Sequence, residues 1–339
     1  MKLLVTGGAG FIGSNFIHYI LKKYPDDWVF NLDKLTYAGN LDNLKNIGKN
    51  RRYKFVKGDI CNRKIVDKVV SEVEVIVNFA AETHVDRSIL GAVPIIKTNI
   101  FGTFNLLEAA KRYKIKKFVQ ISTDEVYGSI QNGSFNEKSL LDASSPYSSS
   151  KAAADLLALS YFKTFKVPVA ITRSTNNFGP YQHPEKFIPL FITNLLENKK
   201  VPLYGQGANI RDWLYVEDNC RAIDLVLRRG QIGEVYNIGA KSEFTNLAVV
   251  KMLLKNIKKD FSSVEYVIDR PAHDLRYSLE IKKIKKLGWR PIYKFHQALQ
   301  KTIKWYKDNE WWWKKIKSKS FKNYYQRQYI KRKKTLSSL

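Results

Sequence analysis

Thr6-Gly-Gly-Ala-Gly-Phe-Ile-Gly13 joins the first apolar segment of the chain to its first amphipathic segment. Gly7, Gly10 and Gly13 have G-x-x-G-x-x-G spacing, a variant of the Rossmann glycine fingerprint. Because glycines lack side chains, backbone N–H groups in such a turn can approach a pyrophosphate, and the N-terminus of the following helix adds positive potential. A tight turn without any ligand would show the same glycines, so the interpretation depends on the residues around the motif.

An acidic residue farther along the chain supports the dinucleotide interpretation. Asp33 ends the second predicted strand, 20 residues beyond Gly13. A carboxylate at this place accepts hydrogen bonds from the ribose of an adenosine and repels a 2′-phosphate. The combination predicts NAD as the cofactor, while Lys34 beside the acid leaves NADP as the alternative. Asp59, after the third predicted strand, is predicted to meet the adenine or else to cap its own loop.

Short apolar segments alternate with amphipathic ones through the first half of the chain. The predicted strands are Leu3–Thr6, Val29–Asp33, Lys54–Gly58, Val75–Phe79, Lys117–Ser122 and Val167–Arg173. The predicted helices include Phe11–Tyr24, Val93–Tyr113 and Pro146–Phe165. Continuous runs of Val, Ile, Leu and Phe are typical of parallel strands that are buried on both faces. The alternation therefore predicts an α/β fold built on a Rossmann-type doubly wound parallel sheet.

The alternation of apolar and amphipathic segments ends near residue 175, where a stretch rich in Gly, Pro and Asn (176–184) follows. We predict a cofactor-binding domain over residues 1–175, with later segments of the chain returning to it. Residues 176–313 are predicted to form mainly a smaller α+β domain that binds the substrate. Residues 314–339 contain clustered lysines and arginines and are predicted to be a basic tail.

The net charge of +27 raises the alternative of nucleic-acid binding, which clustered Lys and Arg favour. Much of the excess is spread over predicted helix surfaces, however, and the densest basic run follows Trp313. We therefore expect a solvated, partly disordered tail there and no nucleic-acid partner, with a docking surface for an acidic partner as the alternative. The aromatic residues from Trp305 to Trp313 are expected to pack in the core or at an interface.

Composition narrows the class of protein further. No apolar run reaches the roughly 18 residues that a membrane span needs, so we expect no membrane partner. The chain enters a predicted strand at Lys2, so we expect no signal peptide. Cys61 and Cys220 stand far apart without metal-ligand spacing, so we expect neither a disulfide nor a metal site. Together these features predict a cytoplasmic protein.

Tyr147-Ser-Ser-Ser-Lys151 lies at the start of a predicted helix. The i, i+4 spacing puts the two reactive side chains on one helix face. An ammonium close to a phenol lowers the pKa of the phenol, so Tyr147 is predicted to act as a base toward a hydroxyl group. The spacing alone is common by chance, but it gains weight behind a glycine-rich strand–helix turn.

Ser122-Thr-Asp-Glu-Val-Tyr-Gly128 follows the fifth predicted strand and contains two adjacent acids. With the motifs above, it resembles the extended short-chain dehydrogenase/reductase superfamily, and within it the dTDP-glucose 4,6-dehydratases most closely. Related 4-epimerases carry small or neutral residues where this chain has Asp124 and Glu125. Further matches are Asp33-Lys-Leu-Thr-Tyr-Ala-Gly-Asn40, Ala80-Ala-Glu-Thr-His-Val-Asp-Arg-Ser88, Arg173-Ser-Thr-Asn-Asn-Phe-Gly-Pro-Tyr181, Pro184-Glu-Lys-Phe-Ile-Pro189, Asn209-Ile-Arg-Asp-Trp213 and Asp269-Arg-Pro-Ala-His-Asp274.

The resemblance implies an NAD-dependent lyase that oxidises dTDP-glucose at C4, eliminates water across C5 and C6, and returns hydride to C6. It implies that Tyr147, with Lys151, takes the C4 hydroxyl proton while Thr123 bonds the C4 oxygen. Glu125 would remove the C5 proton and Asp124 would protonate the leaving C6 hydroxyl. Neighbouring residues on a strand point to opposite faces, so a bend must begin at Ser122 if both acids meet one sugar. The alternative is that one acid caps a helix.

The resemblance also implies two sets of binding residues. Those expected to bind NAD are Gly7, Gly10, Phe11, Ile12, Gly13, Asp33, Lys34, Leu35, Thr36, Asp59, Ile60, Phe79, Ala80, Ala81, Thr83, Thr98, Tyr147, Lys151 and Asn177. Those expected to bind the nucleotide sugar are Thr83, Thr123, Asn176, Lys186, Phe187, Pro202, Leu203, Tyr204, Arg211, Asn246, Asp269, Arg270, Pro271, Ala272 and His273. The cations among them are expected to surround the pyrophosphate and nucleoside.

Three other functions remain as alternatives. The first is a 4,6-dehydratase that acts on UDP-glucose, because the choice between thymine and uracil rests on resemblance alone. The second is a nucleotide-sugar 4-epimerase, which the pair Asp124 and Glu125 disfavours. The third is an NAD-binding regulator without activity, for which the fold alone would suffice. We also expect a homodimer.

Overall fold

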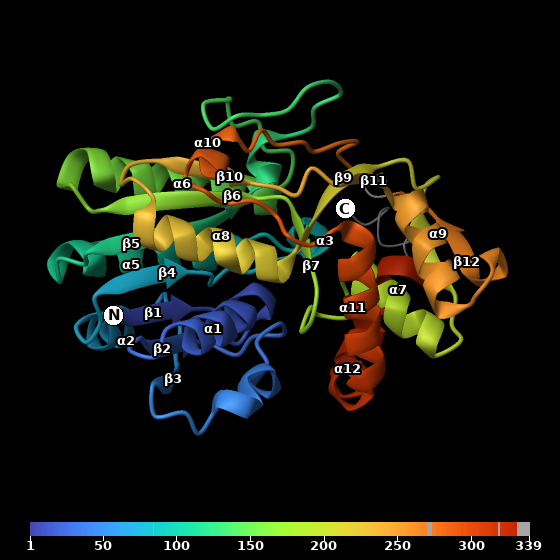
Figure 1. Ribbon diagram of the computed structural model, residues 1–339, viewed down its shortest axis with the longest axis horizontal. Helices are drawn as coiled ribbons and strands as arrows, with labels where there is room; N and C mark the ends of the chain where they lie inside the picture. Colours follow the sequence, from blue (N-terminus) through green and yellow to red (C-terminus); the bar gives the residue numbers. More distant parts are fainter. Residues whose placement is uncertain (84, 270–272, 318, 331–339) are drawn as a thin grey trace.

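The computed structural model describes residues 1–83, 85–269, 273–317 and 319–330. Its centre is a seven-stranded sheet in which every pair of neighbouring strands is parallel (Figure 1). Across the sheet the strands are β10 (Val235–Ile238), β6 (Val169–Ser174), β5 (Lys117–Thr123), β4 (Val75–Asn78), β1 (Lys2–Thr6), β2 (Trp28–Asp33) and β3 (Tyr53–Lys57). The order reverses between β1 and β4, and ligands bind at such a switch point in doubly wound folds.

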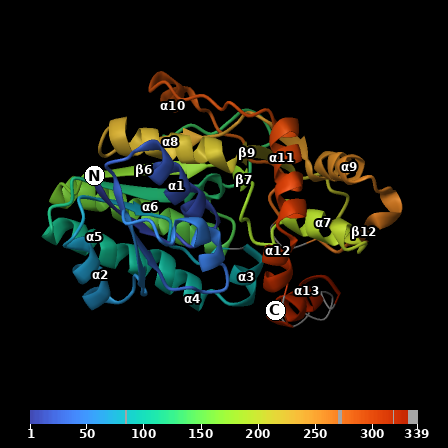
Figure 2. The same ribbon diagram turned by 60° about the horizontal axis from the view of Figure 1, so that its bottom comes forward.

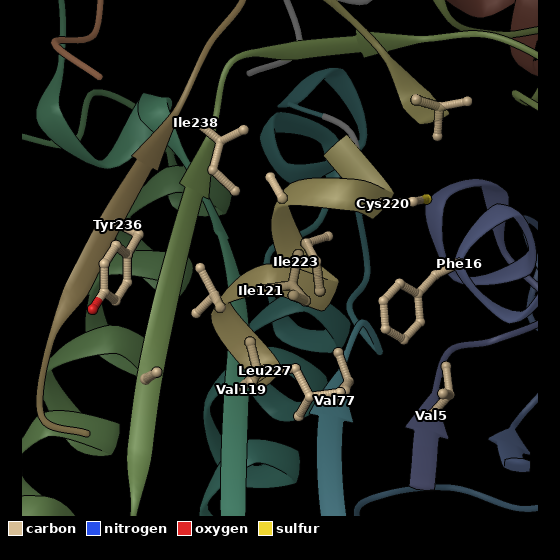
Figure 3. Packing of buried hydrophobic residues seen from close by; sticks show 14 of the residues in the cluster. Val5, Phe16, Val77, Val119, Ile121, Cys220, Ile223, Leu227, Tyr236 and Ile238 are labelled. Atoms are coloured by element: carbon tan, nitrogen blue, oxygen red, sulfur yellow. The ribbon is translucent and has the colours of Figure 1, made fainter. Parts of the chain in front are cut away.

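Helices cover both faces of this sheet. One face packs on α1 (Phe11–Lys23) and α8 (Val216–Arg229), and Figure 3 shows their side chains against the strands. The other face packs on α2 (Arg63–Val70), α5 (Thr103–Arg112) and α6 (Pro146–Phe165). Along β1, Leu3 and Val5 enter the first cluster, whereas Leu4 enters the second. Because successive strand residues point to opposite faces, an unbroken apolar strand fills both layers.

A second group of elements stands beside the carboxyl ends of these strands (Figure 1). It contains a three-stranded sheet of β11 (Glu243–Thr245), β9 (Ile210–Tyr215) and β7 (Asn176–Phe178), and a parallel pair of β12 (Val264–Val267) and β8 (Val201–Tyr204). Its helices include α7 (Phe187–Leu196), α9 (Asn246–Ile257), α11 (Phe295–Asp308) and α12 (Glu310–Ile316). These elements enclose an apolar core of their own, which includes Trp312 and Trp313. The expectation that the late tryptophans pack in a core is confirmed for these two residues.

The remaining elements are short. They are η1 (Leu41–Ile47), α3 (Val85–Leu90), α4 (Val93–Ile96), the π-helical η2 (Lys97–Gly102), η3 (Asp124–Tyr127), η4 (Phe261–Ser263), α10 (Lys282–Lys286), α13 (Lys319–Tyr325) and the π-helical η5 (Gln326–Ile330). The helix predicted over residues 93–113 is therefore interrupted, because η2 separates α4 from α5. Among the described helices, none has the length and apolar character that crossing a bilayer requires.

The predicted Rossmann-type α/β fold is confirmed, and the six predicted strands and the helices at residues 11 and 146 match the observed ones closely. Strand β10 pairs in the large sheet and α8 packs on one face of it, although both follow β7, α7, β8 and β9 of the second group in the chain. This arrangement agrees with the expectation that later segments return to the first layer. The division of the chain into functional domains remains a prediction.

The expectation of a solvated basic tail holds for Lys314, Lys315 and Lys322, which are exposed, but it is wrong for Lys317 and Phe321. Phe321 is buried in the second core, and the Lys317 ammonium donates to the Glu197 carboxylate at 2.5 Å. The aromatic residues between the lysines pack on the apolar surface of the second core. Burying them there is more favourable than leaving them exposed to water. The basic residues 331–339 lie outside the described part of the chain.

Candidate functional site

The glycine turn between β1 and α1 lies against the residues that follow β4. Gly7 has φ +66°, and an added Cβ there would stand 2.7 Å from the backbone N and Cα of Ala80. At Gly13 an added Cβ would stand 2.5 Å from the Gly7 carbonyl oxygen. Both positions therefore require glycine, since the contacts are with backbone that has no room to move. The result is an open helix N-terminus whose N–H groups suit a pyrophosphate.

Asp33 ties this turn to the second strand. Its Oδ2 accepts a hydrogen bond from the Ala9 N–H at 2.9 Å, and its Oδ1 accepts one from the Leu35 N–H at 2.7 Å. Burial raises the pKa of Asp33, while these two backbone donors act in the opposite direction. Asp33 also lines the cleft beside the turn, where a ribose hydroxyl can reach its carboxylate. The acid at this position fits NAD.

Asp59 and Lys34 form an ion pair at the far end of the cleft, with 2.8 Å between Oδ2 and Nζ. Burial by itself would raise the pKa of Asp59, but the bonds from Lys34 and from the Cys61 N–H together lower it. The bond from Cys61 makes Asp59 a cap of its own loop, the alternative that the sequence left open. Asp59 also lines the cleft, so its expected contact with the adenine stays a prediction beside the observed cap. Lys34 is already paired with a carboxylate, which reduces its attraction for a 2′-phosphate.

Most residues expected to bind NAD line one continuous cleft. They are Gly7, Gly10, Phe11, Ile12, Gly13, Asp33, Lys34, Thr36, Asp59, Ile60, Phe79, Ala80, Ala81, Thr83, Thr98, Tyr147 and Lys151. Leu35 does not line this cleft; its backbone N–H supports Asp33 instead. Asn177 does not line it either, because its amide donates to the Ser174 hydroxyl and the Thr175 carbonyl. The fit of the other residues to an extended dinucleotide supports NAD.

Tyr147 and Lys151 occupy the first turns of α6. Ser145 caps this helix and forms a capping box with Ser148, which fixes Tyr147 beside the cleft. The Lys151 ammonium donates to the Ile121 carbonyl at 2.5 Å, and burial lowers the pKa of Lys151 to about 8. Burial, followed by the charge of Glu125, raises the pKa of Tyr147, although a hydrogen bond with Thr83 acts in the opposite direction. The expected lowering by Lys151 is therefore absent here, since the ammonium is turned to the backbone of β5.

Asp124 and Glu125 follow β5 in the short turn η3. The strand ends at Thr123, whose hydroxyl accepts from the Glu125 N–H at 3.3 Å and donates to Asp124 Oδ1 at 3.2 Å. This bend begins one residue after the expected position, so the two acids lie in a turn and not on a straight strand. Asp124 is 2% exposed, and burial followed by the charge of Glu125 raises its pKa well above the usual value. Asp124 is thus suited to keep its proton to a higher pH than an exposed aspartate does.

A second cleft opens between α7, β8, β9 and the start of α9. The predicted substrate residues that line it are Asn176, Lys186, Phe187, Pro202, Leu203, Tyr204, Arg211, Asn246 and His273. Glu185 and Lys186 line both clefts, so the two join at that point. Asn176 Oδ1 is buried and has no hydrogen-bond partner among the described residues. An orphaned polar atom in this wall supports a polar ligand there.

Other predicted substrate residues lie elsewhere. Thr123 stands at the end of β5 and does not line the second cleft, while Thr83 lines the first. The Asp269 carboxylate faces the His273 ring at 2.5 Å and so positions it. Arg270, Pro271, Ala272 and His84 lie outside the described residues.

Sequence reasoning quoted Glu185 within a motif but gave it no role. Its side chain is 0% exposed, and its Oε2 accepts from the Arg87 Nη2 at 2.8 Å. An acid at the start of an apolar helix is a signal that could have identified it. Tyr277 was also missed: its hydroxyl donates to Asp274, and its ring lies 4.5 Å below the Arg211 guanidinium. Tyr329, which lines the second cleft, had no motif to mark it.

Comparison with known proteins adds independent evidence. The family model described as GDP-mannose 4,6 dehydratase matches residues 4–302. A dTDP-glucose 4,6-dehydratase from Streptomyces niveus is 51% identical over 323 residues, which is 94% of this chain and 96% of the relative. A low-salt glycan biosynthesis protein from Haloferax volcanii is 51% identical, over 90% of this chain and 98% of its own.

Solved structures agree with the sequence comparisons. A dTDP-glucose 4,6-dehydratase from Streptomyces venezuelae, solved with NAD bound, has a TM-score of 0.92 and 50% identity, covering 93% of this chain and 100% of its own. A Thermus thermophilus UDP-glucose 4-epimerase, also in complex with NAD, has a TM-score of 0.85 but only 28% identity, over 91% of this chain and 100% of its own. The fold is thus shared with epimerases, whereas the sequence is much more similar to dehydratases.

Proposed function

The chain belongs to the nucleotide-sugar dehydratase family that the GDP-mannose 4,6 dehydratase model describes, and from this premise we propose that it is a dTDP-glucose 4,6-dehydratase. This enzyme converts dTDP-glucose to dTDP-4-dehydro-6-deoxy-glucose and water. One observation carries the choice of reaction: Asp124, which is buried and has a raised pKa, adjoins Glu125 next to Tyr147. Elimination of water needs both an acid and a base, whereas epimerisation at C4 needs neither of these carboxyl groups.

The cofactor of the proposed reaction is NAD, held by the glycine turn and by Asp33. Bound NAD supplies a hydride acceptor for C4 of the glucose and a hydride donor for C6. The tight contacts of Gly7 and Gly13 leave the N–H groups of the turn accessible to the pyrophosphate. Lys34 and Asp59 neutralise each other beside the adenosine end, which supports NAD over NADP.

The first proton transfer is assigned to Tyr147. It accepts the proton of the C4 hydroxyl as the C4–H bond breaks, so that a ketone forms at C4. Because burial and Glu125 both raise the pKa of Tyr147, its phenolate requires a positive charge nearby. We assign that charge to Lys151, one turn along α6 and lining the same cleft, whose ammonium would have to turn from the Ile121 carbonyl toward the phenol. Thr123 at the end of β5 is proposed to hydrogen-bond the C4 oxygen.

The elimination is assigned to the pair of acids in η3. The ketone at C4 acidifies the C5–H bond, and Glu125 removes that proton. Asp124 gives its proton to the C6 hydroxyl, the C6–O bond breaks, and water leaves with a double bond formed between C5 and C6. Hydride addition at C6 and return of a proton to C5 complete the product. The raised pKa of Asp124 supports its assignment as the acid.

The nucleotide part of the substrate is proposed to occupy the second cleft. Lys186 lies where the two clefts meet, so it is suited to the pyrophosphate next to the reacting sugar. Burial lowers the pKa of Lys186, with Glu185 acting in the opposite direction. Arg211 lines the same cleft and adds a guanidinium to it, and Tyr204 offers an aromatic surface to the base.

Incubating the purified protein with dTDP-glucose tests the proposal directly. We expect a product that is lighter than the substrate by one water, with a ketone at C4 and no lasting accumulation of NADH. UDP-glucose serves as the comparison for base selectivity, and the same product from UDP-glucose alone would establish the alternative dehydratase. Conversion to dTDP-galactose without loss of water would establish an epimerase.

The proposed assembly is a homodimer formed through the face of α4, η2, α5 and α6. Neighbouring helices there expose apolar side chains: Val93, Ile96, Phe101, Phe104, Leu156 and Phe165. Such a patch supports burial against a second copy. Light scattering should give twice the chain mass, and Leu156→Glu should give the monomer. Leu140→Glu, at an exposed leucine outside these helices, should leave the mass unchanged.

The proposed location is the cytoplasm. Cys61 and Cys220 are free thiols, and Cys220 is buried in the core beside α1 (Figure 3). A reducing compartment keeps such thiols intact. Fractionation of cells that produce the protein should recover it with the cytosol, and recovery from a secreted fraction would contradict this location.

A further inference from the structure

Ala9, in the middle of the glycine turn, is held in place by three hydrogen bonds. Its N–H donates to the Asp33 carboxylate. Its carbonyl oxygen accepts two bonds from the segment that follows β2, one from the Asn40 N–H at 3.0 Å and one from the Asn43 side-chain amide at 2.9 Å. Asn40 caps η1 and Asn43 belongs to it. The position of the glycine turn therefore depends on the position of η1.

Asn43 connects this turn to the second group of elements. The Trp312 indole N–H, from α12, donates to Asn43 Oδ1 at 2.8 Å. An indole N–H is only a donor, so the oxygen of the Asn43 amide must face Trp312 and its NH₂ group must face the Ala9 carbonyl. Asn43 is 2% exposed and Trp312 is 1% exposed, so water cannot replace this bond.

Aromatic contacts fix the Trp312 ring in the second core. Its ring centroid lies 5.1 Å from that of Trp305 and 6.2 Å from that of Tyr181. Tyr181 also stacks on His18 of α1, with ring centroids 5.8 Å apart, and His18 Nε2 lies 2.8 Å from the Asn43 carbonyl oxygen. Figure 2 shows α12 continuing from the lower end of α11. Trp312 is thus a firmly packed anchor for Asn43.

Two further contacts join α12 to η1, but they lie at the surface. Lys315 pairs with Asp42 at 2.5 Å, and Lys45 lies 5.6 Å from the centre of the Trp311 ring. The Lys315 side chain and Trp311 are both more than half exposed, so each contact contributes little. The buried bond between Trp312 and the amide of η1 is therefore the stronger connection.

We propose that Trp312 and Asn43 are positioning residues for the cofactor, because through the Ala9 carbonyl they hold the glycine turn in the shape that retains NAD. The inference rests on the proposed function, since it takes the first cleft as the site of NAD. Neither residue lines that cleft, so both act through the turn. Backbone N–H groups bind a pyrophosphate well only while they converge on it, so a displaced Ala9 weakens the binding.

The rate at which the purified holoenzyme loses NAD during dialysis tests this role. Trp312→Phe keeps an aromatic ring in the core but removes the N–H, and it should release NAD about fivefold faster, the effect expected for one lost hydrogen bond. Trp313→Phe is the matched control. Trp313 is equally buried on the same helix, but its indole N–H donates to the Tyr306 carbonyl within the second group. Both variants should lower the melting temperature, whereas only Trp312→Phe should release NAD faster.

Asn43→Ala is the second variant, because it leaves α12 unchanged. It should release NAD at least as fast as Trp312→Phe does. The double variant should release NAD no faster than Asn43→Ala alone, since both residues act through one hydrogen bond. Saturating NAD should restore the kcat of each variant, and calorimetric titration should give the wild-type dissociation constant for dTDP.

Equal rates of NAD loss from Trp312→Phe and Trp313→Phe would overturn the proposal. A parallel loss of dTDP affinity, or a low kcat that added NAD does not restore, would also overturn it, because either result indicates a general structural role. If wild type retains NAD but does not convert dTDP-glucose, the proposed reaction fails, whereas the dialysis still decides the role of Trp312.

Discussion

The first cleft is built around a glycine turn that packs directly on backbone, whereas the wall of the second cleft consists mostly of large side chains. Gly7 and Gly13 touch main-chain atoms at distances that admit no Cβ. In the second cleft, Tyr204, Arg211 and His273 come from separate strands and loops and meet only through tertiary packing. The two clefts meet at Glu185 and Lys186.

This difference indicates which part of each cleft determines specificity for the cofactor and which determines specificity for the nucleotide. A cofactor recognised by backbone geometry leaves almost no freedom for substitution, because the backbone cannot be exchanged. A nucleotide recognised by side chains can be exchanged for another by changing a few residues, while the fold and the chemistry stay the same. The similarity to both dehydratases and epimerases in one fold agrees with that division.

The largest effect is expected from Gly7→Ala, which places a methyl group against the backbone next to the glycine turn. The new methyl group would collide with the Ala80 backbone at a residue with positive φ, so the turn must move. We expect purified protein without bound NAD and with no measurable turnover, together with a lower melting temperature. Absorbance of released cofactor and thermal unfolding check this outcome.

Gly91→Ala provides the matched control for that substitution. Gly91 has no atom within 4 Å of an added Cβ and does not line either cleft. It should retain NAD and full turnover. Normal NAD content in Gly7→Ala would show that side chains, and not the turn, hold the cofactor.

The next largest effects are expected from the residues assigned to proton transfer, namely Asp124, Glu125 and Tyr147. Glu125→Gln and Asp124→Asn should each lower kcat by ~10²–10⁴-fold, because each removes one proton transfer of the elimination. Hydride transfer should suffer less, so reduced cofactor should appear in a single turnover and persist. Tyr147→Phe should instead prevent the reduction of the cofactor.

Stopped-flow absorbance of the reduced nicotinamide distinguishes these steps, and mass analysis follows the loss of water. Asp142→Asn is a suitable control, since Asp142 is an exposed acid, whereas Asp124 is buried and Glu125 is half-buried. Product formation at the wild-type rate by both acid variants would exclude the assigned pair.

The histidine His183, which lines the first cleft, makes the free energy of unfolding depend on pH. Burial lowers the pKa of His183 to about 4, with Glu185 opposing this effect and the charges of Arg87 and Lys186 adding to it. The unfolded chain therefore binds more protons between pH 6.5 and pH 4, and stability is lost as the pH falls through that window. Between pH 7 and 4.5, wild type should lose roughly 2 kcal/mol more than His183→Asn.

Urea unfolding at several pH values measures this difference. His296→Asn, at an exposed histidine, should follow the wild-type curve. Equal pH dependence of wild type and His183→Asn would mean that this ring does not stay neutral in the folded protein.

The smallest effect is expected from Lys34→Ala. Lys34 is 57% exposed on its side chain, and such ion pairs contribute little to stability or binding. The dissociation constant for NAD should change by at most about fivefold. Titrations with NAD and NADP measure it, and a large loss of NADP binding would show that Lys34 attracts the 2′-phosphate despite its pairing with Asp59.

The residues of the first cleft could be predicted from the sequence because they belong to motifs that are short and local. The glycine turn, Asp33 and the Tyr147–Lys151 spacing are local patterns, and the parallel sheet brings them together at one edge. What spacing could not show was the direction of the Lys151 ammonium, which donates to the backbone of β5. Burial then controls the pKa of Tyr147, and burial is a property of the folded chain.

Residues of the second cleft could be predicted only where they lie in a motif that resembles the family. Lys186, Arg211 and Asn246 line it as expected. Tyr329 was missed because one tyrosine among lysines gives no local signal, and its partner Tyr204 lies 125 positions earlier in the chain. The composition of the last residues suggested solvation, whereas their spacing of aromatics by four is a helical packing pattern.

The place of β10 at the edge of the large sheet has a consequence for the synthesis of the protein on the ribosome. β6 ends at Ser174, and its neighbour β10 begins at Val235, 61 residues later. At ~5–20 residues per second, the nascent chain spends roughly 3 to 12 seconds with β6 as an open edge. An apolar edge strand with free N–H and C=O groups is a template for aggregation. Premature termination between these two strands therefore leaves a fragment that chaperones must capture before it pairs with another.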